Sequence, residues 1–593
     1  MTMPAMTKTL LLAAALLVGI ACNESTSPPP PVTVPTAARL AFTVQPSNAT
    51  AGVAISPPVT VTIQDASGNP MTNATDRVTV ALRTTASGGT LSGTTAVDAV
   101  NGVATFSNIA IQLASTGYTL TASSGTWTGA TSAAFAIAPA AAAKVAFAVQ
   151  PGTTDVAEPI TPAVQVAIQD AFANTVTSAT NAVTLAIATN PGSGTLAGTR
   201  TVNALGGMAA FSGLSIDKAG TDYTLAATSV MLAGATSAAF DVTLPLMFAA
   251  VNAGGYHTCG VTTAGAAYCW GANDAGQLGD ATLTDHTSPV VVGGGFTFTA
   301  VSAGLAHNCG VTTAGAAYCW GYNGTGQLGD GTTTNQTRPV AVLGGLTFAA
   351  VTAGLDHTCG VTTAGAAYCW GYNGSGLLGD GTTTPRTGPV AVLGGLTFAA
   401  VSAGRDHTCG VTTAGAGYCW GRNDYSQLGD GTTTQRTSPV AVLGGLTFAV
   451  ASAAWFYTCS VTTPGAAYCW GLNYSGQLGD GTTTPRPSPV AVGGGLTFAA
   501  VSAGGYHTCG VTSVGTAYCW GENLDGELGD GSTTSRTSPV TVGGGLSFAK
   551  VSAGVAHTCG VTTGGAAYCW GYNAAGELGD GSTTDRLSPV RVK

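Results

Sequence analysis

Charged side chains are scarce in this chain. Only 8% of its 593 residues are Asp, Glu, Lys or Arg, and the balance is acidic, with a formal net charge of −9 at pH 7. Nucleic-acid binding calls for a basic stripe, so this composition argues against that class of protein. It also argues against disorder, because disordered chains combine low hydrophobicity with many charges and 45% of this chain is hydrophobic.

Familiar catalytic motifs are also missing. The sequence has no Gly-x-Ser-x-Gly nucleophile elbow, no metalloprotease helix motif and no phosphate-binding loop. No closely spaced set of carboxylates suggests a calcium site. We therefore expect no enzyme activity, no cofactor and no bound metal.

Glycine, alanine, threonine and valine dominate instead, and glycine alone supplies 86 residues. Glycine is poor in helices, whereas valine and threonine suit strands, so this composition favours short β-strands joined by many turns. A chain of 593 residues is also too long for one hydrophobic core. We expect an all-β protein with several domains.

One fifteen-residue stretch, residues 257–271, returns six more times at steps of fifty residues without an insertion. It reads His-Thr-Cys-Gly-Val-Thr-Thr-Ala-Gly-Ala-Ala-Tyr-Cys-Trp-Gly and begins again at His307, His357, His407, Tyr457, His507 and His557. Four strand-like pieces recur in each copy; in the second they are residues 298–302, 307–312, 317–320 and 339–342. Four short strands in each of seven repeats predict a seven-bladed β-propeller over residues 246–593. How its ring closes is left open, since a terminal strand that completes the first blade is one solution.

Fourteen of the fifteen cysteines form seven pairs, each ten residues apart. In a hairpin of that register the two side chains lie opposite one another on the same face, at a Cα separation of roughly 4.5–5.5 Å. We therefore predict one disulfide in each repeat. A zinc site that includes His257 is the alternative, but zinc takes four ligands and this spacing lacks the usual tight knuckle. The predicted pairs are Cys259–Cys269, Cys309–Cys319, Cys359–Cys369, Cys409–Cys419, Cys459–Cys469, Cys509–Cys519 and Cys559–Cys569.

The N-terminal residues 1–22 are typical of an export signal. Lys8 precedes an apolar run at residues 10–18 that is too short to span a membrane. The ending Gly19-Ile-Ala-Cys22 resembles a bacterial lipoprotein box, which implies that Cys22 is lipidated and becomes the mature N-terminus; an ordinary secretory signal with an incidental cysteine is the alternative. Residues 23–36 contain four consecutive prolines and predict an extended linker.

Two copies of a longer unit follow, 105 residues apart, which we assign to residues 37–138 and 142–243. Ala41-Phe-Thr-Val-Gln-Pro46 recurs as Ala146-Phe-Ala-Val-Gln-Pro151, and Tyr118-Thr-Leu120 recurs as Tyr223-Thr-Leu225. About 100 residues of short strands and turns predict a β-sandwich, with the two tyrosines as tyrosine corners. Both units resemble bacterial immunoglobulin-like domains of the invasin and intimin type, which implies a stalk.

The fifty-residue repeat resembles the regulator of chromosome condensation repeat. The resemblance is carried by His-Thr-Cys-Gly-Val, Tyr-Cys-Trp-Gly-x-Asn, Gly-Gln-Leu-Gly-Asp-Gly and Ser-Pro-Val, and it covers about 345 residues. It implies a seven-bladed propeller, and secreted bacterial members of the family include an inhibitor of a secreted enzyme. The founder is a nucleotide exchange factor that binds chromatin. An exported acidic chain meets neither of those partners, so we do not carry that activity over.

Residues that recur in all seven copies are predicted to support the scaffold. Seven Tyr/Trp pairs such as Tyr268 and Trp270 suit packing between blades, since both lie on the face of the strand opposite to the cysteine. Each recurring histidine is expected to hydrogen-bond local backbone. The recurring arginines are expected to pair with the aspartate of the Gly-Asp-Gly loop; they are Arg386, Arg436, Arg486, Arg536 and Arg586.

Positions at which the copies differ are where function is expected. The residues just before each His-Thr-Cys strand supply aromatic, Asp and Arg side chains, the types that anchor protein interfaces. The fifth copy differs most, because Trp455-Phe-Tyr457 replaces a small pair and the histidine; local repacking is the alternative explanation. A second variable set follows the tryptophan, at Asp274, Tyr425, Tyr474 and Asp525. The predicted binding residues are Tyr256, Asp356, Arg405, Asp406, Trp455, Phe456, Tyr457 and Tyr506.

These features predict an exported, surface-anchored binding protein, either a lipoprotein of the outer membrane or cell surface or a secreted protein. Its propeller is expected to present a protein-interaction face, for adhesion or for inhibition of a secreted enzyme. A glycan ligand is an alternative that the exposed aromatics allow. A propeller hydrolase or lyase is the competing class, with no acid, base or nucleophile set to support it. We expect no nucleic-acid partner, and membrane contact only through the N-terminal lipid.

Overall fold

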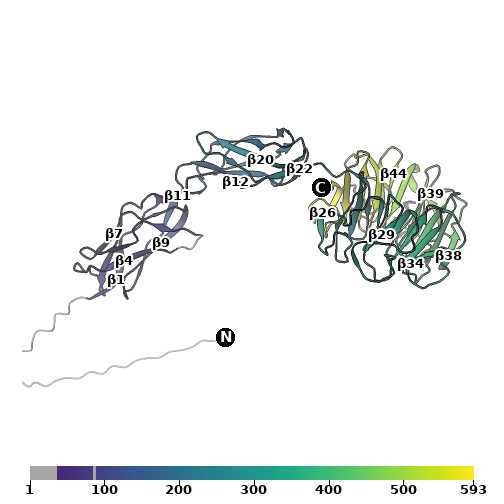
Figure 1. Cartoon of the computed structure of the whole chain (residues 1–593), viewed down its shortest axis with the longest axis horizontal. Coiled ribbons are helices and arrows are strands. Elements are labelled where there is room, and N and C mark those ends of the chain that lie inside the picture. The colour runs from purple at the N-terminus through teal and green to yellow at the C-terminus, as the bar shows by residue number, and fades with distance from the viewer. Residues whose placement is uncertain (1–35, 84–87) are drawn as a thin grey trace, which may run out of the picture. The chain divides into compact units, whose positions relative to one another are not determined.

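A computed structural model describes residues 36–83 and 88–593 of the chain. The predicted signal, the lipidation of Cys22 and all but the last residue of the predicted linker lie outside the described residues. The regular secondary structure of the described residues is β-strand, apart from a single short 3₁₀ helix, η1 (Gly493–Gly495) (Figure 1). It divides into two compact units, one that ends at Thr243 and one that begins at Leu244.

The first unit holds two modules of matching topology. In the first module a three-stranded sheet has the order β1-β3-β7 and a larger sheet has the order β2-β11-β9-β4-β6, with β10 beside β9 and a separate β5-β8 pair. The strands are β1 (Ala37–Val44), β2 (Ala49–Thr50), β3 (Val59–Asp65), β4 (Arg77–Arg83), β5 (Leu91–Ser92), β6 (Ala96–Asp98), β7 (Val103–Phe106), β8 (Ala110–Ile111), β9 (Ser115–Ser123), β10 (Ala130–Thr131) and β11 (Phe135–Ala138).

The second module repeats this arrangement strand for strand. Its sheets have the orders β12-β14-β18 and β13-β22-β20-β15-β17, with β21 beside β20 and a separate β16-β19 pair. The strands are β12 (Lys144–Val149), β13 (Thr154–Asp155), β14 (Val164–Gln169), β15 (Ala182–Thr189), β16 (Leu196–Ala197), β17 (Thr201–Asn203), β18 (Met208–Phe211), β19 (Ser215–Ile216), β20 (Gly220–Ser229), β21 (Ala235–Thr236) and β22 (Phe240–Thr243).

Each module is held together by an apolar core between its two sheets. Alternation along β4 buries Val78 and Val80 and exposes their neighbours, as expected for a strand with one face in a core. The hydroxyl of Tyr118 donates to the carbonyl of Leu113 at 2.9 Å, and Tyr223 makes the same bond five residues back. This is the hydrogen bond of a tyrosine corner, as the sequence predicts for both residues.

The second unit contains seven four-stranded antiparallel sheets, each built from one contiguous fifty-residue repeat. The first strands are β23 (Phe248–Ala253), β27 (Phe298–Ala303), β31 (Phe348–Ala353), β35 (Phe398–Ala403), β39 (Phe448–Ala453), β43 (Phe498–Ala503) and β47 (Phe548–Ala553). The second strands are β24 (His257–Thr262), β28 (His307–Thr312), β32 (His357–Thr362), β36 (His407–Thr412), β40 (Tyr457–Thr462), β44 (His507–Thr512) and β48 (His557–Thr562).

The third and fourth strands complete each sheet. The third strands are β25 (Ala267–Gly271), β29 (Ala317–Gly321), β33 (Ala367–Gly371), β37 (Gly417–Gly421), β41 (Ala467–Gly471), β45 (Ala517–Gly521) and β49 (Ala567–Gly571). The fourth strands are β26 (His286–Val291), β30 (Gln336–Ala341), β34 (Arg386–Ala391), β38 (Arg436–Ala441), β42 (Arg486–Ala491), β46 (Arg536–Thr541) and β50 (Arg586–Arg591). The fourth strand begins three residues earlier than the predicted 339–342 in the second repeat, because it already pairs with the third strand at Gln336.

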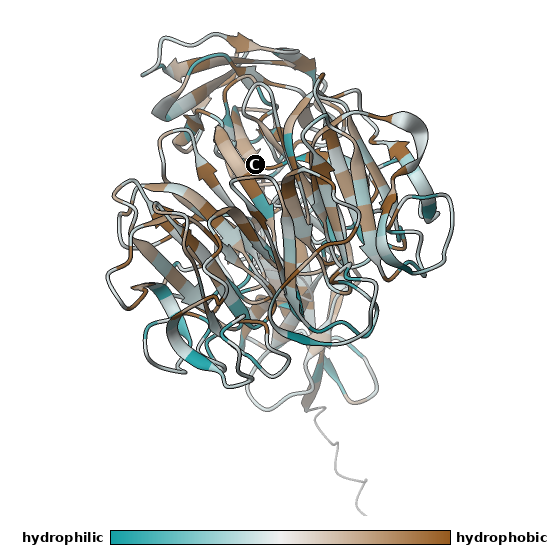
Figure 2. Cartoon of the chain, turned by 90° about the vertical axis from the view of Figure 1, so that its right-hand side faces the viewer, coloured by the Kyte–Doolittle hydropathy of each residue, from teal (hydrophilic) through white to brown (hydrophobic). Residues whose placement is uncertain are grey.

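The predicted disulfide is present in every sheet. Cys259 and Cys269 are directly paired across β24 and β25, with their Cα atoms 4.1 Å apart, and the other six pairs repeat this register. The cystine of one sheet packs against the Phe and Trp side chains of the next sheet, so the apolar core lies between sheets. Figure 2 shows hydrophobic residues concentrated along these strands.

Polar contacts of one kind join each sheet to the next. The carbonyl of Glu577, in the loop between β49 and β50 of the last repeat, accepts hydrogen bonds from the Thr258 hydroxyl and the Trp270 indole of the first sheet, both at 2.8 Å. The carbonyl of Gln277 accepts the equivalent hydrogen bonds from Asn308 and Trp320 of the second sheet. The first and seventh sheets are therefore joined like any consecutive pair. The ring closes without a strand exchanged between its ends, which answers the question that the sequence left open.

The recurring histidines belong to the same joints. Nε2 of His307 lies 2.9 Å from the Thr358 hydroxyl oxygen of the next sheet, and His557 makes the equivalent contact to Thr258 across the ring closure. The prediction that each histidine hydrogen-bonds local backbone is wrong, because the imidazole ring contacts a side chain of the neighbouring sheet instead. The predicted Arg–Asp pairs are confirmed within single loops, at 2.7–2.9 Å, in the third to seventh repeats.

Candidate functional site

Both variable sets of residues lie at one end of the ring. The first set joins the first strand of each sheet to the second, and the second set follows the third strand. Because His407 pairs with Gly421, residues 405–406 and 422–425 leave their antiparallel strands side by side. We call this end of the ring the loop face. The Thr-Thr-Ala-Gly turns and the Leu393 loops lie at the opposite end of the same strands.

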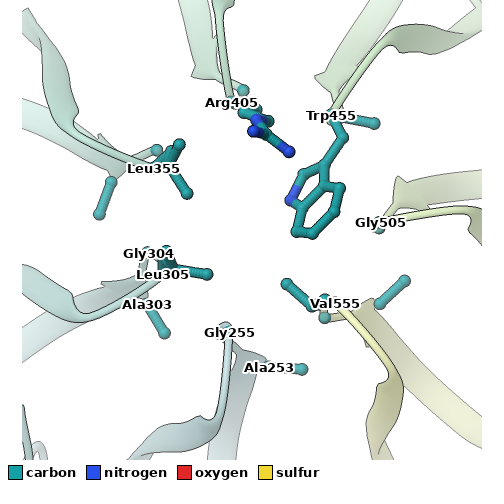
Figure 3. Close-up of a pocket in the computed structure, with 18 of the residues that line it drawn as sticks. Ala253, Gly255, Ala303, Gly304, Leu305, Leu355, Arg405, Trp455, Gly505 and Val555 are labelled. Atoms are coloured by element: carbon teal, nitrogen blue, oxygen red, sulfur yellow. The ribbon is translucent and has the colours of Figure 1, made fainter.

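A narrow opening lies at the centre of the loop face, with a volume of about 100 Å³. Each of the seven repeats supplies its wall, mostly with alanine and glycine, and the residue that varies most is the one at position 405 or its equivalents. Leu305, Leu355 and Val555 are small or aliphatic there, whereas Arg405 and Trp455 reach towards the axis (Figure 3). A charged and an aromatic side chain from two adjacent repeats therefore line one side of the opening, and small or aliphatic residues line the rest.

A half-buried group of side chains surrounds these two residues. The Arg405 guanidinium carbon lies 4.8 Å from the centroid of the Trp455 ring and 5.0 Å from that of Phe456. Tyr425 and Tyr506 flank the pair, with ring centroids 5.2 Å from Phe456 and 5.4 Å from Trp455 respectively. Together with Arg422 they form what we call the arginine–aromatic cluster, which consists of Arg405, Arg422, Tyr425, Trp455, Phe456 and Tyr506.

Carboxylates hold the two arginines of the cluster in place. Asp406 lies within 3.4 Å of Arg405 and 3.3 Å of Arg422, and Asp424 lies 2.7 Å from Arg422. Neighbouring Asp356 has a raised pKa, mainly because burial disfavours its charged form and also because Asp406 is close, while Arg405 acts in the opposite sense. Each of the two arginines is thus ion-paired to at least one carboxylate.

The structure brings together five of the eight predicted binding residues and places the other three differently. Arg405, Asp406, Trp455, Phe456 and Tyr506 form or contact the cluster. Asp356 lies beside it on the loop face. Tyr256 stands apart, where its ring is 6.3 Å from Tyr572 at the junction of the last and first sheets.

The prediction that Tyr457 is a binding residue is wrong. Its side chain is completely buried, and its hydroxyl donates to the carbonyl of His507 at 2.6 Å. It fills the place of the histidine in a joint between sheets, so it does not belong to an accessible surface. For this residue the alternative of local repacking is the right one.

Sequence reasoning missed several residues of the loop face. Arg422 and Tyr572 occupy the position directly after the tryptophan-glycine pair, where the seven copies read Ala, Tyr, Tyr, Arg, Leu, Glu and Tyr. Glu527 and Glu577 replace a glutamine that four other copies carry. Burial raises the pKa of both carboxyls to about 7. The seven copies differ at these positions as clearly as at the positions of the predicted binding residues, so the same comparison could have identified them.

Two other classes of site find no support in residues 36–83 and 88–593. Within that part of the chain no three His, Cys, Asp or Glu side chains are grouped so as to hold a metal ion. Nor does any helix there have the length and apolar character to cross a membrane.

Comparison with known proteins places the chain in a family. A model described as RCC1-like domain matches residues 235–542, just over half of the chain, and a model of the regulator of chromosome condensation (RCC1) repeat matches residues 548–577. No curated protein sequence matches significantly.

Solved structures that match part of this chain are about 20% identical to it over the aligned residues. Human WBSCR16 is 21% identical over 53% of this chain and 86% of its own, with a TM-score of 0.49. Prp20p from Saccharomyces cerevisiae is 20% identical over 58% and 87%, with a TM-score of 0.49. The CRINKLY WD40 ectodomain of ACR4 from Arabidopsis thaliana is 20% identical over 55% and 96%, with a TM-score of 0.37. By the extent of the first family match, this chain belongs to the RCC1-like domain family and carries its β-propeller.

Proposed function

We propose that this chain is an exported, surface-anchored protein that binds another protein through the loop face of its propeller. In this proposal the two N-terminal modules are immunoglobulin-like domains that form a stalk, and the seven sheets are the blades of the propeller. The lipidated Cys22 anchors the stalk, and the bound partner is an adhesion target or a secreted enzyme that is inhibited. No enzyme activity is proposed.

The arginine–aromatic cluster is the observation that carries this proposal. Tryptophan, tyrosine and arginine are enriched among the residues that dominate the binding energy of protein interfaces. Arg405 lies over two rings and is ion-paired to Asp406, so it is already oriented when a partner arrives. Little side-chain entropy is then lost on binding, and contacts with such a group translate efficiently into affinity.

The seven repeats supply variants that test the cluster with little risk to the fold. Arg405→Leu installs the residue found in the second and third repeats, and Phe456→Ala installs the residue found in the second and seventh. We expect the double variant to capture its protein partner at least about 100-fold more weakly, since truncation of an interface hot spot costs about 2 kcal/mol or more. The assay is capture from the secreted fraction of the source cells by immobilised full-length chain, followed by a titration with the captured protein.

A matched control comes from the opposite end of the ring. Leu393 is 48% exposed there, and Leu393→Gly installs the residue of the first, fifth and sixth repeats. This variant should bind like the original chain. Equal loss in both variants, or undiminished capture by the double variant, contradicts a binding surface at the cluster. Capture of a glycan in place of a protein assigns the face to the alternative ligand class.

A further inference from the structure

A second hollow on the loop face lies apart from the arginine–aromatic cluster. It lies over the first repeat, between loops of the seventh and second repeats, and has a volume of about 350 Å³, within the usual range of small-ligand pockets. Two tyrosines and two carboxylates supply its distinctive lining, and no Lys, Arg or His lines it. We call it the junction pocket; the lining residues that matter here are Tyr256, Asp274, Tyr572 and Glu577.

The pocket runs from an exposed rim to a buried floor. Tyr256 is 47% exposed, whereas Glu577 is completely buried. One carboxylate oxygen of Glu577, Oε2, accepts a hydrogen bond from the amide of Ala575 at 2.9 Å. The other, Oε1, is buried without a partner among the described residues. A buried carboxylate oxygen that lacks a donor is a strong acceptor for any N–H group that reaches it.

Carboxylates lie near this oxygen. Glu577 has its pKa raised to about 7, first by burial and further by the nearby carboxylates of Asp585 and Asp285. Asp274 supplies the other carboxylate of the pocket lining; it is exposed and accepts a hydrogen bond from Gln277. Such a group of like charges in a concave site attracts a cation. An organic cation complements these carboxylates.

The two tyrosines select the shape of that cation. Tyr256 and Tyr572 meet edge to face with their ring centres 6.3 Å apart, and both rings line the pocket. Aromatic faces attract ammonium groups and give an alkyl chain apolar surface to pack on. A primary ammonium also has three N–H groups, any of which can donate a hydrogen bond to the recessed Oε1 of Glu577. A quaternary ammonium has no N–H group and cannot make this bond.

The other six junctions between sheets do not repeat this combination. The sixth and seventh sheets bring Glu522 and Glu527 together with Ala556, so carboxylates are present there without tyrosines. The fifth and sixth sheets place Tyr506 beside Leu472 and Gln477, so an aromatic ring is present without a carboxylate. Over the first repeat, the pocket combines two tyrosines, Tyr256 and Tyr572, with two lining carboxylates, Asp274 and Glu577.

We infer that the junction pocket binds a primary ammonium group carried on an alkyl chain, with Glu577 and Asp274 as its anionic partners and Tyr256 and Tyr572 along the chain. The ligand is either a free alkylamine or the side chain of a lysine in a peptide. This site does not depend on the arginine–aromatic cluster, and it stands or falls separately from the proposed function.

The test uses full-length protein at pH 8 and low ionic strength, where the carboxylates are ionised. n-Butylammonium chloride and the peptide acetyl-Gly-Lys-Gly-amide are titrated separately, with binding followed by ligand-observed NMR. Binding of the free amine assigns the site to alkylamines in general, and binding of the peptide alone assigns it to lysine side chains. Tetramethylammonium, which has no N–H donor, should bind at least about tenfold more weakly than n-butylammonium.

Three variants distinguish the pocket from general electrostatic attraction. Glu577→Gln installs the residue of four other repeats and should weaken binding at least about tenfold, and Tyr256→Ala, the residue of two other repeats, should weaken it about threefold. Glu527→Gln removes the same charge one junction away and should leave binding unchanged. Circular dichroism checks that all three fold. No binding of either amine, or equal effects of Glu577→Gln and Glu527→Gln, overturns the inference.

Discussion

Six buried histidines predict that the propeller loses stability in mild acid. They are His257, His307, His357, His407, His507 and His557, and each is no more than 1% exposed. Burial lowers their pKa to about 4 for His257 and His507 and to about 3 for the other four. In the folded chain these rings therefore stay neutral well below the pKa of an unfolded histidine, about 6.5.

The sign and size of the effect follow from proton linkage. As pH falls below about 6.5 the unfolded chain takes up protons that the folded chain does not, so stability falls until the folded pKa is reached. At pH 5 each histidine favours the unfolded state by about 2 kcal/mol, or about 12 kcal/mol for six. Glu527 and Glu577 have the opposite effect, because their pKa values are raised to about 7 in the folded chain. Their protonation between pH 8 and pH 5 increases the free energy of unfolding by about 5 kcal/mol in total.

Urea unfolding of the full-length chain at intervals from pH 8 to pH 4.5 measures this effect. Tryptophan fluorescence reports mainly on the propeller, which holds eight of the nine tryptophans. The net loss expected between pH 8 and pH 5 is about 7 kcal/mol, with the steepest fall below pH 6. The transition of the two N-terminal modules, followed by circular dichroism, serves as an internal reference because no histidine lies in residues 37–243.

The fifth repeat supplies the matched variant. Tyr457 replaces the histidine there, and its hydroxyl bonds to the backbone of His507 and lies 3.0 Å from the Thr508 hydroxyl oxygen. His407→Tyr repeats this exchange one sheet earlier and should reduce the proton uptake on unfolding by about one at pH 5. Stability that stays constant from pH 7 to pH 5, or proton uptake that His407→Tyr leaves unchanged, refutes the reasoning that these rings are buried and neutral.

Three further predictions concern other parts of the chain. Glu527→Gln with Glu577→Gln should raise propeller stability at pH 8 by up to about 3 kcal/mol per residue and leave it unchanged at pH 4, as judged by urea midpoints; no gain at pH 8 means that the carboxyls are solvated. Cys359→Ser with Cys369→Ser should cost about 3 kcal/mol, since a disulfide closing a ten-residue separation restrains the unfolded chain by about that amount, and mass spectrometry of the unreduced parent should find seven intra-repeat links. Cys22→Ser should move the protein from the membrane fraction to the medium; retention in membranes would exclude the lipid anchor.

The sequence alone determined the scaffold because the repeat is so regular. A ten-residue separation in a hairpin places Cys259 opposite Cys269, and strand alternation places Trp270 on the other face. These relations are local, so they follow from period and register without knowledge of the ring. The Tyr118 and Tyr223 hydrogen bonds are local in the same sense, since each reaches back five residues.

Only the tertiary structure decided which residues meet across sheets. His307 binds Thr358, fifty-one residues away, and Tyr457 is buried in such a joint although its neighbours Trp455 and Phe456 reach the loop face. Arg422 joins the cluster because two loops of one sheet and a loop of the next converge. The junction pocket exists because the last repeat packs on the first, which brings Tyr572 to Tyr256 across 316 residues of chain. Local pattern fixes a residue's strand and face, whereas contacts between repeats depend on the closure of the ring.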